Sequence, residues 1–510
     1  MSVSTAHSTV AELVRSFTDA DPGRAGAEYG PLVKALWNDG ALTGLALPAV
    51  PELVAQLAEV DDERKGHLVV LLGLLAEAEY PAAGEVTAAV REGLDLYLDL
   101  WSRSPNGEPL STALAYLVAH FPDDRDRILA VAAGRELDAD DLTRLERALD
   151  RLDPDNPVLG RVFPSPAVWA LMDGDEREFD QSWIRALPAE QIQSNWEKDT
   201  RTVLAHAGAK AYWAVCNGTP APVVTGSVPP RDANEPLPGL DVEAFGRHAD
   251  AFRCPSCHAG LDFASEGIRC TGCSTEYAVA GGILNLLEGA ERNGDDFLYR
   301  LAEMPSMGLF YEAYARPNFL RIAGGNWGGQ VTPADEKSYI LEHVRPVAGP
   351  VLDLAAGAGT WTAMLTEAVG AERVIALDMY PPMLSALRRK LVEVPAVMAS
   401  AAVLPFDDAS LGAVICWNAL QAFPDHAAAA IAEVGRCLRP GGTFTLLTFN
   451  MAEDPIARYF QASHYFPGHQ EGMQLFEPGD IKRWLTDAGL VVHEESRPGT
   501  FIIITAQRPE

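Results

Sequence analysis

The chain has 510 residues, of which 48% are hydrophobic and 22% are charged, which is typical of globular proteins and, at this length, of about three domains. The formal net charge is −31 at pH 7; residues 1–250 carry 21 basic and 41 acidic residues, and residues 251–510 carry 19 and 30. Proteins that bind nucleic acid concentrate Lys and Arg where the phosphates lie. The charge therefore disfavours a nucleic-acid partner and favours a small or apolar substrate, or a protein partner.

The sequence predicts a cytoplasmic protein without a membrane anchor. The N-terminus lacks a basic region followed by an apolar run, and no apolar stretch approaches the ~18–20 residues that span a bilayer. Four of the seven cysteines form two close pairs, whereas Cys216, Cys416 and Cys437 are scattered and fit small buried hydrophobic residues rather than a secreted disulfide framework. The oligomeric state stays open, a homodimer included.

Residues 1–217 are predicted to form an all-α domain. Apolar residues recur at helical spacing, and turns rich in Asp, Gly and Pro separate the segments. The clearest helical segments are Leu53–Val60, His67–Ala76, Val86–Trp101 and Ser111–His120. One stretch, LSTALAYLVAHFPDD, resembles a helix of a HEAT-like repeat, although no clean period follows. Such helices either pack on the rest of the protein or form a concave surface that holds a partner.

Residues 218–245 are predicted to be a linker, because they are rich in Pro and Gly and show little periodicity. The following residues, 246–290, contain the pattern C-x2-C, twelve residues, C-x2-C, formed by Cys254, Cys257, Cys270 and Cys273. Two such turns at the ends of a short hairpin aim four thiolates at one point, which suits a structural Zn²⁺ ion. A redox dithiol is the alternative, but a doubled motif speaks against it.

The residues after the cysteines resemble a known module. Glu276–Leu287 follows the pattern CxxCxxxYxVxxGIxxLL, which is similar to the small zinc-ribbon activators of tRNA and release-factor methyltransferases and to ribbons fused ahead of bacterial methyltransferase domains. This resemblance implies a zinc ribbon and names no substrate.

From residue 350 the pattern changes to alternating strands and helices. The apolar strand Val351–Leu354 runs into a turn with Gly357 and Gly359, and a helix begins near Trp361. Glycines at such a turn let the backbone approach a ligand, and the helix N-terminus offers free N–H groups. The second strand ends at Asp378, where an acid can accept both ribose hydroxyls of an adenosine.

The combination VLDLAAGAGTW, VIALDMY, LPFDDASLGAVICWNAL and RCLRPGGTFTLLTF resembles class I S-adenosylmethionine (SAM)-dependent methyltransferases, in particular the group that includes ubiquinone and menaquinone biosynthesis enzymes. The resemblance implies an α/β Rossmann-like domain of seven strands over residues 291–510. Dinucleotide binding is the rival interpretation, but the third glycine of that fingerprint is Thr362 here.

The resemblance also implies roles at the cofactor. Asp353 would orient the loop and the amino end of methionine, and Ala355 stands where the family usually has Gly in the loop with Gly357 and Gly359. The other expected cofactor contacts are Asp378 on the ribose, Met379 on the adenine, Ser400 and Ala401 near the adenine amine, and Trp417 and Asn418 at the end of the fourth strand.

Upstream, Tyr311 and Tyr314 resemble a Y-x-x-Y-A segment whose tyrosine reaches over the cofactor in related enzymes, with Tyr314 expected on the cofactor and Tyr311 a catalytic candidate; core packing is the alternative. Trp327 is flanked by Gly and is predicted to be a wall of the substrate site.

After the fourth strand the family often has His, but Gln421 and Phe423 stand there and are expected to contact substrate. His426 and His464 are the candidates for a general base, and catalysis by proximity alone is the alternative. Tyr459 and Tyr465, in an aromatic-rich insert, either cover an apolar or aromatic acceptor or pack on the core.

Three functions remain: methylation of a small, apolar or aromatic molecule in natural-product or quinone-like metabolism; methylation of a peptide, protein or carrier-bound substrate gripped by the helical domain; and methylation of rRNA or tRNA, which the acidic charge disfavours. The intact glycine loop and Asp378 argue against a binding-only pseudoenzyme.

Overall fold

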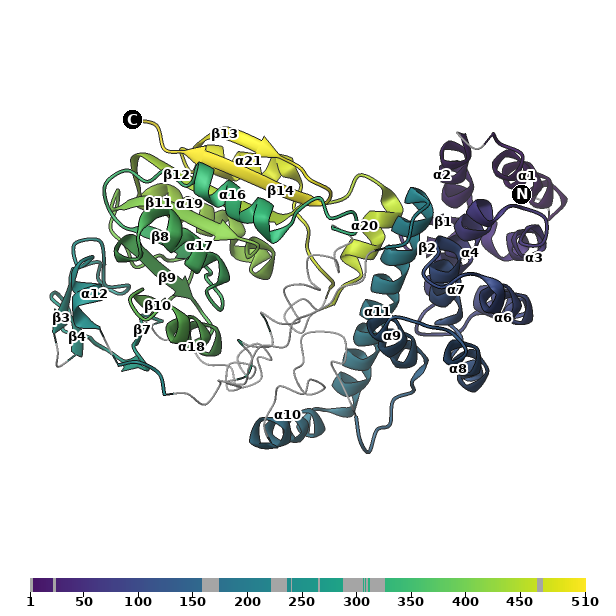
Figure 1. The fold of residues 1–510 in the computed structure, drawn as a ribbon, viewed down its shortest axis with the longest axis horizontal. Helices are drawn as coiled ribbons and strands as arrows, with labels where there is room; N and C mark the ends of the chain where they lie inside the picture. Colours follow the sequence, from purple (N-terminus) through teal and green to yellow (C-terminus); the bar gives the residue numbers. More distant parts are fainter. Residues whose placement is uncertain are drawn as a thin grey trace.

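The computed structural model has a helical part and an α/β part that lie side by side along the long axis of the molecule (Figure 1). It describes residues 3–21, 24–157, 174–221, 236–239, 241–264, 267–287, 306, 308, 311, 326–465 and 471–510. Tyr314 therefore lies outside the described residues, as does most of the segment between the ribbon and residue 326. Within the described ranges, none of the helices is long and apolar enough to cross a membrane.

The helical part contains the helices that the sequence predicts, and one short hairpin. The helices are α1 (Val3–Thr18), α2 (Ala25–Leu36), α3 (Ala46–Gln56), α4 (Asp62–Glu77), α5 (Glu85–Arg91), α6 (Leu94–Arg103), α7 (Pro109–Val118), α8 (Arg125–Ala133), α9 (Ala139–Leu149), α10 (Gly174–Ala186) and α11 (Ala189–Asn217). Strands β1 (Trp37–Asn38) and β2 (Ala41–Leu42) pair between α2 and α3. The predicted segment Val86–Trp101 is two helices, because the chain turns at Gly93, the residue before α6.

Helix α4 is the centre of the helical core. Its residues from Leu68 to Leu75 are buried around the whole circumference, and α7 and α11 pack directly against it. A helix that is apolar on all sides is stable only when neighbours surround it. The remaining helices of this part therefore form a shell around α4, α7 and α11.

The α/β part is a nine-stranded sheet in the order β13-β14-β12-β11-β8-β9-β10-β7-β6. Its strands are β6 (Val279–Ala280), β7 (Ile283–Asn285), β8 (Val351–Leu354), β9 (Val374–Asp378), β10 (Ala396–Met398), β11 (Leu411–Trp417), β12 (Leu438–Phe449), β13 (Val491–Ser496) and β14 (Phe501–Gln507). Strands β7 to β12 are parallel where they pair, whereas β14 is antiparallel to β12 and to β13. The covering helices are α16 (Pro333–His343), α17 (Thr360–Val369), α18 (Pro381–Lys390), α19 (Ala427–Cys437), α20 (Pro455–Ala462) and α21 (Pro478–Asp487).

This arrangement confirms the predicted combination of a helical part with a Rossmann-like α/β part. The seven strands expected after residue 290 are β8 to β14, and the hairpin β6–β7 adds two more at the edge next to β10. Parallel strands joined by helices place the carboxyl ends of β8, β9, β11 and β12 at one edge of the sheet, where ligands bind in such folds.

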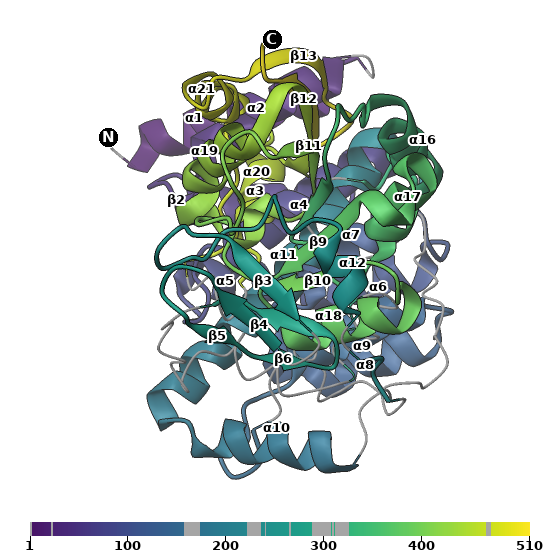
Figure 2. The same cartoon turned by 90° about the vertical axis from the view of Figure 1, so that its left-hand side faces the viewer.

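The cysteine-containing segment is built into the α/β part. Its three-stranded sheet, β3 (Leu261–Ala264), β4 (Gly267–Cys270) and β5 (Glu276–Tyr277), lies in front of the large sheet in Figure 2. The backbone N–H of Arg253 donates to the carbonyl oxygen of Pro405 (2.9 Å), and that of Asp407 donates to Ala251 (2.8 Å). The short helix α12 (Val242–Gly246) falls within the predicted linker, and its Phe245 lies in the same hydrophobic core as this sheet and the strands.

Helix α20 belongs to the α/β part by sequence and to the helical core by packing. Ile456 and Phe460 are buried in the core formed by α4, α7 and α11. The ring of Phe460 lies edge-on to that of Tyr116, at a centroid distance of 5.8 Å. A Cβ atom on Gly208 of α11 would lie 2.3 Å from this ring, so the glycine permits the close approach of α20.

A buried carboxylate completes this interface. Glu77 at the end of α4 accepts hydrogen bonds from the hydroxyls of Tyr116 (2.6 Å) and Tyr459 (3.1 Å). The ring of Tyr459 also stands edge-on to Trp37. Apolar contacts and these two hydrogen bonds therefore join the two parts.

The substitution Phe460→Ala should destabilise the helical part by about 3–5 kcal/mol, because it leaves a cavity in that core. Chemical denaturation measures the loss of stability. In a separate experiment on the folded protein, hydrogen–deuterium exchange should be faster in α4, α7 and α11 than in the wild type. The matched control is Phe476→Ala, which removes a ring packed on Trp484 in the core of the α/β part and should increase exchange near α21 instead. Unchanged protection of α7 and α11 in Phe460→Ala would contradict the shared core.

Candidate cofactor and acceptor site

The turn between β8 and α17 has the backbone conformation that brings a chain close to a ligand. Ala355, Gly357 and Gly359 all have positive φ angles, of 59°, 55° and 88°. This left-handed conformation favours glycine, which explains why the related pattern has Gly at the position of Ala355. At Gly359 a Cβ atom would also lie 2.8 Å from Leu387 of α18, so the loop can pass over α18 only with glycine there.

Asp378, the last residue of β9, ties this loop to the neighbouring strand. Its two carboxylate oxygens accept hydrogen bonds from the backbone N–H groups of Gly357 (2.8 Å) and Tyr380 (2.9 Å). Burial raises the pKa of Asp378, and these backbone hydrogen bonds act in the opposite direction. Each carboxylate oxygen keeps a free lone pair, so the side chain can still accept hydrogen bonds from two hydroxyl groups.

Asp353 lies in the interior below the same loop. Its carboxylate accepts a hydrogen bond from the hydroxyl of Thr362 in α17 (2.6 Å). Burial raises the pKa of Asp353 to about 7, and the negative charge of Asp378 adds to this effect. A buried carboxylate with a raised pKa is stabilised when a cation binds beside it.

The residues predicted at the adenine lie on the next turns of the same edge. Met379 follows Asp378 and is 46% exposed, so its side chain is free to cover a flat ring. The hydroxyl of Ser400 accepts a hydrogen bond from the backbone N–H of Ala402 (3.2 Å), and Ala401 is buried beside it. The Ser400 hydroxyl thus stabilises a local turn, and this position offers no carboxylate to the adenine amine.

One of the two predicted tyrosines lies over the glycine loop. A Cβ atom on Gly357 would lie 3.9 Å from the ring of Tyr311, so this ring passes within contact distance of the loop. This position suits a residue that closes the cofactor site.

The carboxyl ends of β11 and β12 carry a rigid polar network. The indole N–H of Trp417 donates to Glu336 of α16 (3.1 Å). The side-chain amide of Gln421 donates to the carbonyl oxygen of Asn418 (2.7 Å) and accepts from the hydroxyl of Thr448 (2.8 Å). Gln421 is thereby fixed between the two strands.

Asn418 has an unusual backbone and an unpaired amide. It adopts a φ of 56° and is buried, and among the described residues its Nδ2 atom has no hydrogen-bond partner. A buried amide donor without a partner costs about 1–3 kcal/mol, so a bound molecule that accepts this hydrogen bond is stabilised. The end of β11 is therefore suited to bind a ligand oxygen or nitrogen atom that accepts this hydrogen bond.

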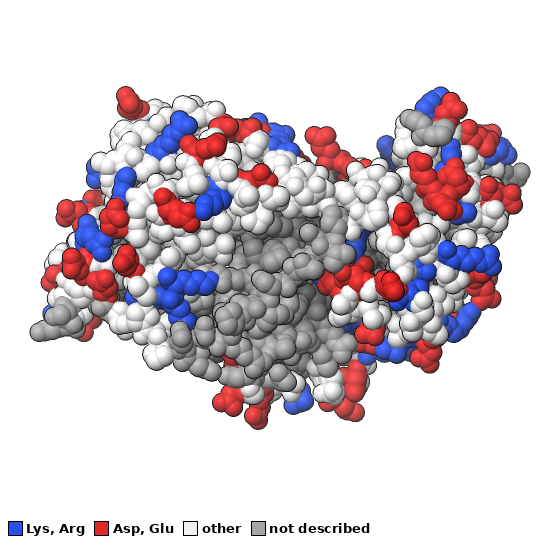
Figure 3. All heavy atoms as spheres, viewed as in Figure 1, with Lys and Arg blue, Asp and Glu red and all other residues white. Residues whose placement is uncertain are grey.

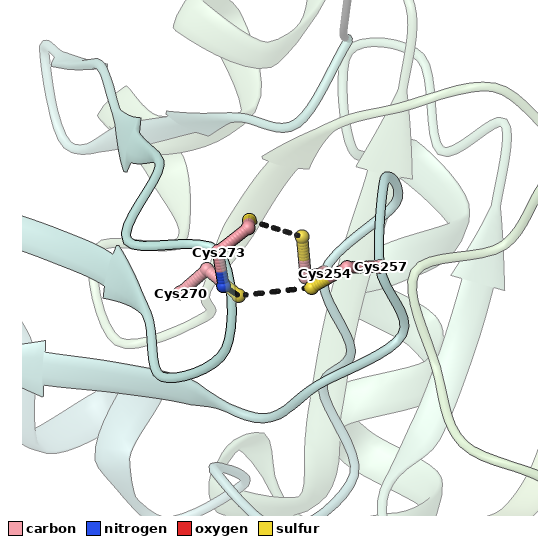
Figure 4. A group of neighbouring side chains, drawn as sticks. All are labelled: Cys254, Cys257, Cys270 and Cys273. Atoms are coloured by element: carbon pink, nitrogen blue, oxygen red, sulfur yellow. Dashed lines mark hydrogen bonds between the residues drawn. The ribbon is translucent and has the colours of Figure 1, made fainter.

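The four cysteines predicted to bind a metal converge on one point (Figure 4). Their sulfur atoms all lie within 4.8 Å of one another. Backbone N–H groups of Gly272 and Cys273 point at the sulfur of Cys270 (3.3 and 3.4 Å), as in turns that stabilise thiolates. The hydroxyl of Tyr277 lies 2.9 Å from the sulfur of Cys254. Four thiolates in this arrangement fit a tetrahedral Zn²⁺ ion.

Comparison with known proteins decides the family. A model described as "Methyltransferase domain" matches residues 351–442. An uncharacterised chloroplastic methyltransferase of Arabidopsis thaliana is 28% identical over 298 residues, covering 50% of this chain and 78% of that protein. A methyltransferase-like protein of Schizosaccharomyces pombe is 33% identical over 195 residues, covering 34% of this chain and 70% of that protein. The demethylmenaquinone methyltransferase of Thermus thermophilus is 38% identical over 103 residues, covering 19% and 46%.

The chain belongs to the methyltransferase family. The resemblance seen in the sequence is confirmed, and the protein is a SAM-dependent methyltransferase with a class I fold. The matched residues 351–442 contain the glycine loop, Asp378 and the end of β11, which are the parts of the site described above.

The two histidines predicted as bases lie in different surroundings in this methyltransferase. His426 is exposed just before α19, and Phe423 is half-buried against the sheet. His464 is fully buried, and burial lowers its pKa to about 4. The imidazole of His464 is therefore neutral and a weak base, so it suits a hydrogen-bond acceptor better than a group that removes a proton.

The predicted substrate residues Trp327, Tyr459 and Tyr465 all contact the helical part. The ring of Trp327 lies edge-on to His206 of α11 (5.2 Å), and Tyr459 binds Glu77. The backbone N–H of Tyr465 donates to the hydroxyl of Thr202 (3.0 Å). The contacts of Thr202 with Tyr465 and of His206 with Trp327 bring α11 against this segment, and no local pattern in the sequence marks Thr202 or His206.

The substitution Asp378→Ala should weaken SAM binding at least about tenfold. It removes a charge-assisted hydrogen-bond acceptor, worth about 1.5–3 kcal/mol, and releases the N–H of Gly357. Isothermal titration calorimetry with SAM measures the change. The control is Asp425→Ala, an exposed aspartate on the loop after β11, which should leave the affinity unchanged. Equal affinities for both variants would exclude Asp378 from the cofactor site.

Proposed function

We propose that this methyltransferase transfers the methyl group of SAM to a small, apolar or aromatic molecule in specialised metabolism. The observation that carries the proposal is the close packing of the helix after β12, and of Trp327, against the helical part. Helix α20 follows β12 directly and is buried in the helical core, and Trp327 packs on α11. A small molecule fits a site enclosed in this way better than a folded macromolecule does.

The residues at the sheet edge supply position rather than covalent chemistry. SAM carries an activated methyl group when it is bound. Asp353, the turn with Gly357 and Gly359, and Asp378 would hold this cofactor, and Asn418 would hold the acceptor atom at the end of β11. Alignment of the two reactants and exclusion of water account for most of the rate enhancement expected in such a transfer. The neutral ring of His464 can accept a hydrogen bond from a hydroxyl acceptor.

The surface charge disfavours a nucleic-acid substrate. On the face shown in Figure 3, Lys and Arg side chains are interspersed with Asp and Glu. With a net charge of −31, this pattern does not suit rRNA or tRNA. A carrier-bound or peptide substrate is the second candidate, because helices of the helical part border the site and could contact a carrier.

We also propose that Cys254, Cys257, Cys270 and Cys273 bind a structural zinc ion. All four positions are thiolates, so no open position remains for catalysis. Cys254 and Cys270 are buried in the hydrophobic core that includes strands β8, β9 and β11. The ion would thus stabilise the sheet itself. None of the seven cysteines, all of which lie in the described ranges, forms a disulfide.

Metal analysis of the purified protein should give one zinc per chain, and Cys273→Ser should lower the content to well below one. Because the cysteine sheet shares a core with the methyltransferase sheet, this variant should also unfold at lower denaturant concentration. Cys216→Ser, at an exposed cysteine of α11, is the matched control with full zinc. A zinc-free wild-type protein that is fully folded would contradict this site.

Labelled SAM offered with sets of small aromatic and apolar metabolites should yield a labelled product with the wild type and not with Asp378→Ala. A carrier-bound substrate would give a different pattern. The carrier-bound form would then be labelled by the full-length protein, and its free analogue would not. Methyl transfer to RNA alone, with strong salt dependence, would overturn the proposal.

A further inference from the structure

Three segments that are distant in sequence meet along one face of α11. Thr202 and His206 are four residues apart, so they share a face of the helix. The hydroxyl of Thr202 binds the backbone N–H of Tyr465, and the ring of His206 contacts Trp327. The loop after α20 and the loop before α16 therefore lie next to each other against α11.

Arg144 of α9 reaches the same place. Its Nε atom donates to a carboxylate oxygen of Asp140 (2.8 Å), and that same oxygen lies 3.7 Å from Nε2 of His206. His464 is brought to the same face of α11 by its neighbour Tyr465, whose backbone N–H binds Thr202. Helices α9 and α20 both pack against α11 (Figure 1).

Three buried polar atoms of this cluster have no hydrogen-bond partner in the described part of the chain. They are Nη1 of Arg144, Nε1 of Trp327 and Nε2 of His464, in side chains that are 7%, 2% and 0% exposed. Buried polar atoms are nearly always paired, and each unpaired one costs about 1–3 kcal/mol. Three such atoms from three segments can each form a hydrogen bond with a bound group.

The chemistry of that group follows from the atoms. Arg144 and Trp327 can only donate, and a guanidinium bound to one carboxylate has N–H groups left for a second. Nδ1 of His464 lies 3.3 Å from the carbonyl oxygen of Gln461, which accepts the Nδ1 proton. Nε2 of the neutral ring is then an acceptor. The cluster offers two donors and one acceptor.

We propose that this cluster, formed by Arg144, Trp327 and His464, binds the polar end of the methyl acceptor, namely a carboxylate that Arg144 and Trp327 hold and a hydroxyl that donates to His464. The inference rests on the proposed function and narrows its acceptor to an aromatic hydroxy acid. It also gives the helical part a direct role, since Arg144 belongs to α9 and the wall behind the cluster is α11.

The test uses benzoate and the 2-, 3- and 4-hydroxybenzoates as probes, titrated into the full-length protein by calorimetry at constant ionic strength. At least one hydroxybenzoate should bind about threefold or more tightly than benzoate, the gain expected from one hydrogen bond. Arg144→Met should weaken both kinds of probe about tenfold or more. His464→Phe should remove the advantage of the hydroxyl and leave benzoate affinity unchanged.

Two matched variants control for burial. Arg64→Met removes an equally buried arginine, paired with Asp61 at the start of α4, and His67→Phe removes a buried histidine of α4. Both should bind the probes as the wild type does. A separate titration with S-adenosylhomocysteine tests the cofactor site in every variant, and the affinity should stay within about twofold of the wild type.

The outcomes separate the two proposals. Failure of the wild type to bind S-adenosylhomocysteine would overturn the proposed function, whereas the probe titration still decides the cluster. The inference is overturned if the wild type binds none of the probes at millimolar concentration, or if Arg144→Met and His464→Phe bind them as the wild type does. It is also overturned if the Arg64 and His67 controls lose binding equally.

Discussion

The burial of α20 in the helical core is the contact on which the arrangement of the molecule depends. Strand β12 ends at Phe449 and α20 begins at Pro455, so only a short turn separates them. Wherever α20 is buried, the carboxyl end of β12 must be near. Burying a side chain such as Phe460 contributes about 1.5–3 kcal/mol, and the hydroxyl of Tyr459 on Glu77 fixes its orientation. Helix α11, which packs on α20, is thereby held near the carboxyl end of β12.

The cysteine-containing segment constrains the sheet at another place, beside strand β10. Without β6 and β7, strand β10 would be an edge strand with unpaired backbone groups, which invites association with other chains. The pairing of Ile283–Asn285 with β10 covers this edge, and the backbone N–H of Leu286 adds a hydrogen bond to Met398. Helical part and ribbon thus constrain the methyltransferase sheet from two sides, which makes the three segments one structure.

The candidate cofactor site contains two buried carboxylates whose negative charges need stabilising partners. Asp353 and Asp378 are both buried, and the charge of one raises the pKa of the other. Their remaining stabilisation comes from the hydroxyl of Thr362 and from backbone N–H groups. Two carboxylates so close together are costly in a protein interior, and a ligand with a cationic end and hydroxyl groups offsets that cost. The methyl donor has both features, which fits the family to which the chain belongs.

The sequence by itself determined the class of this protein. The strand–glycine–helix pattern, Asp378 and the two cysteine pairs are local, so the physical requirement behind each is visible in neighbouring letters: positive φ at Gly357, an acid at a strand end, thiolates on tight turns. The helices of residues 1–217 were also predictable from apolar spacing, apart from the β1–β2 hairpin and the break at Gly93.

The tertiary structure alone decided which helices lie beside the proposed acceptor site. Tyr459 was predicted to cover a substrate or pack on the core, and the structure buries its helix among α4, α7 and α11. Arg144 and His206 carry no local signal, because an ion pair inside a helix looks the same in sequence whether it faces water or a site. They meet through contacts between separate segments, such as that of His206 with Trp327, and such contacts depend on how whole helices pack, which no short pattern in the sequence encodes.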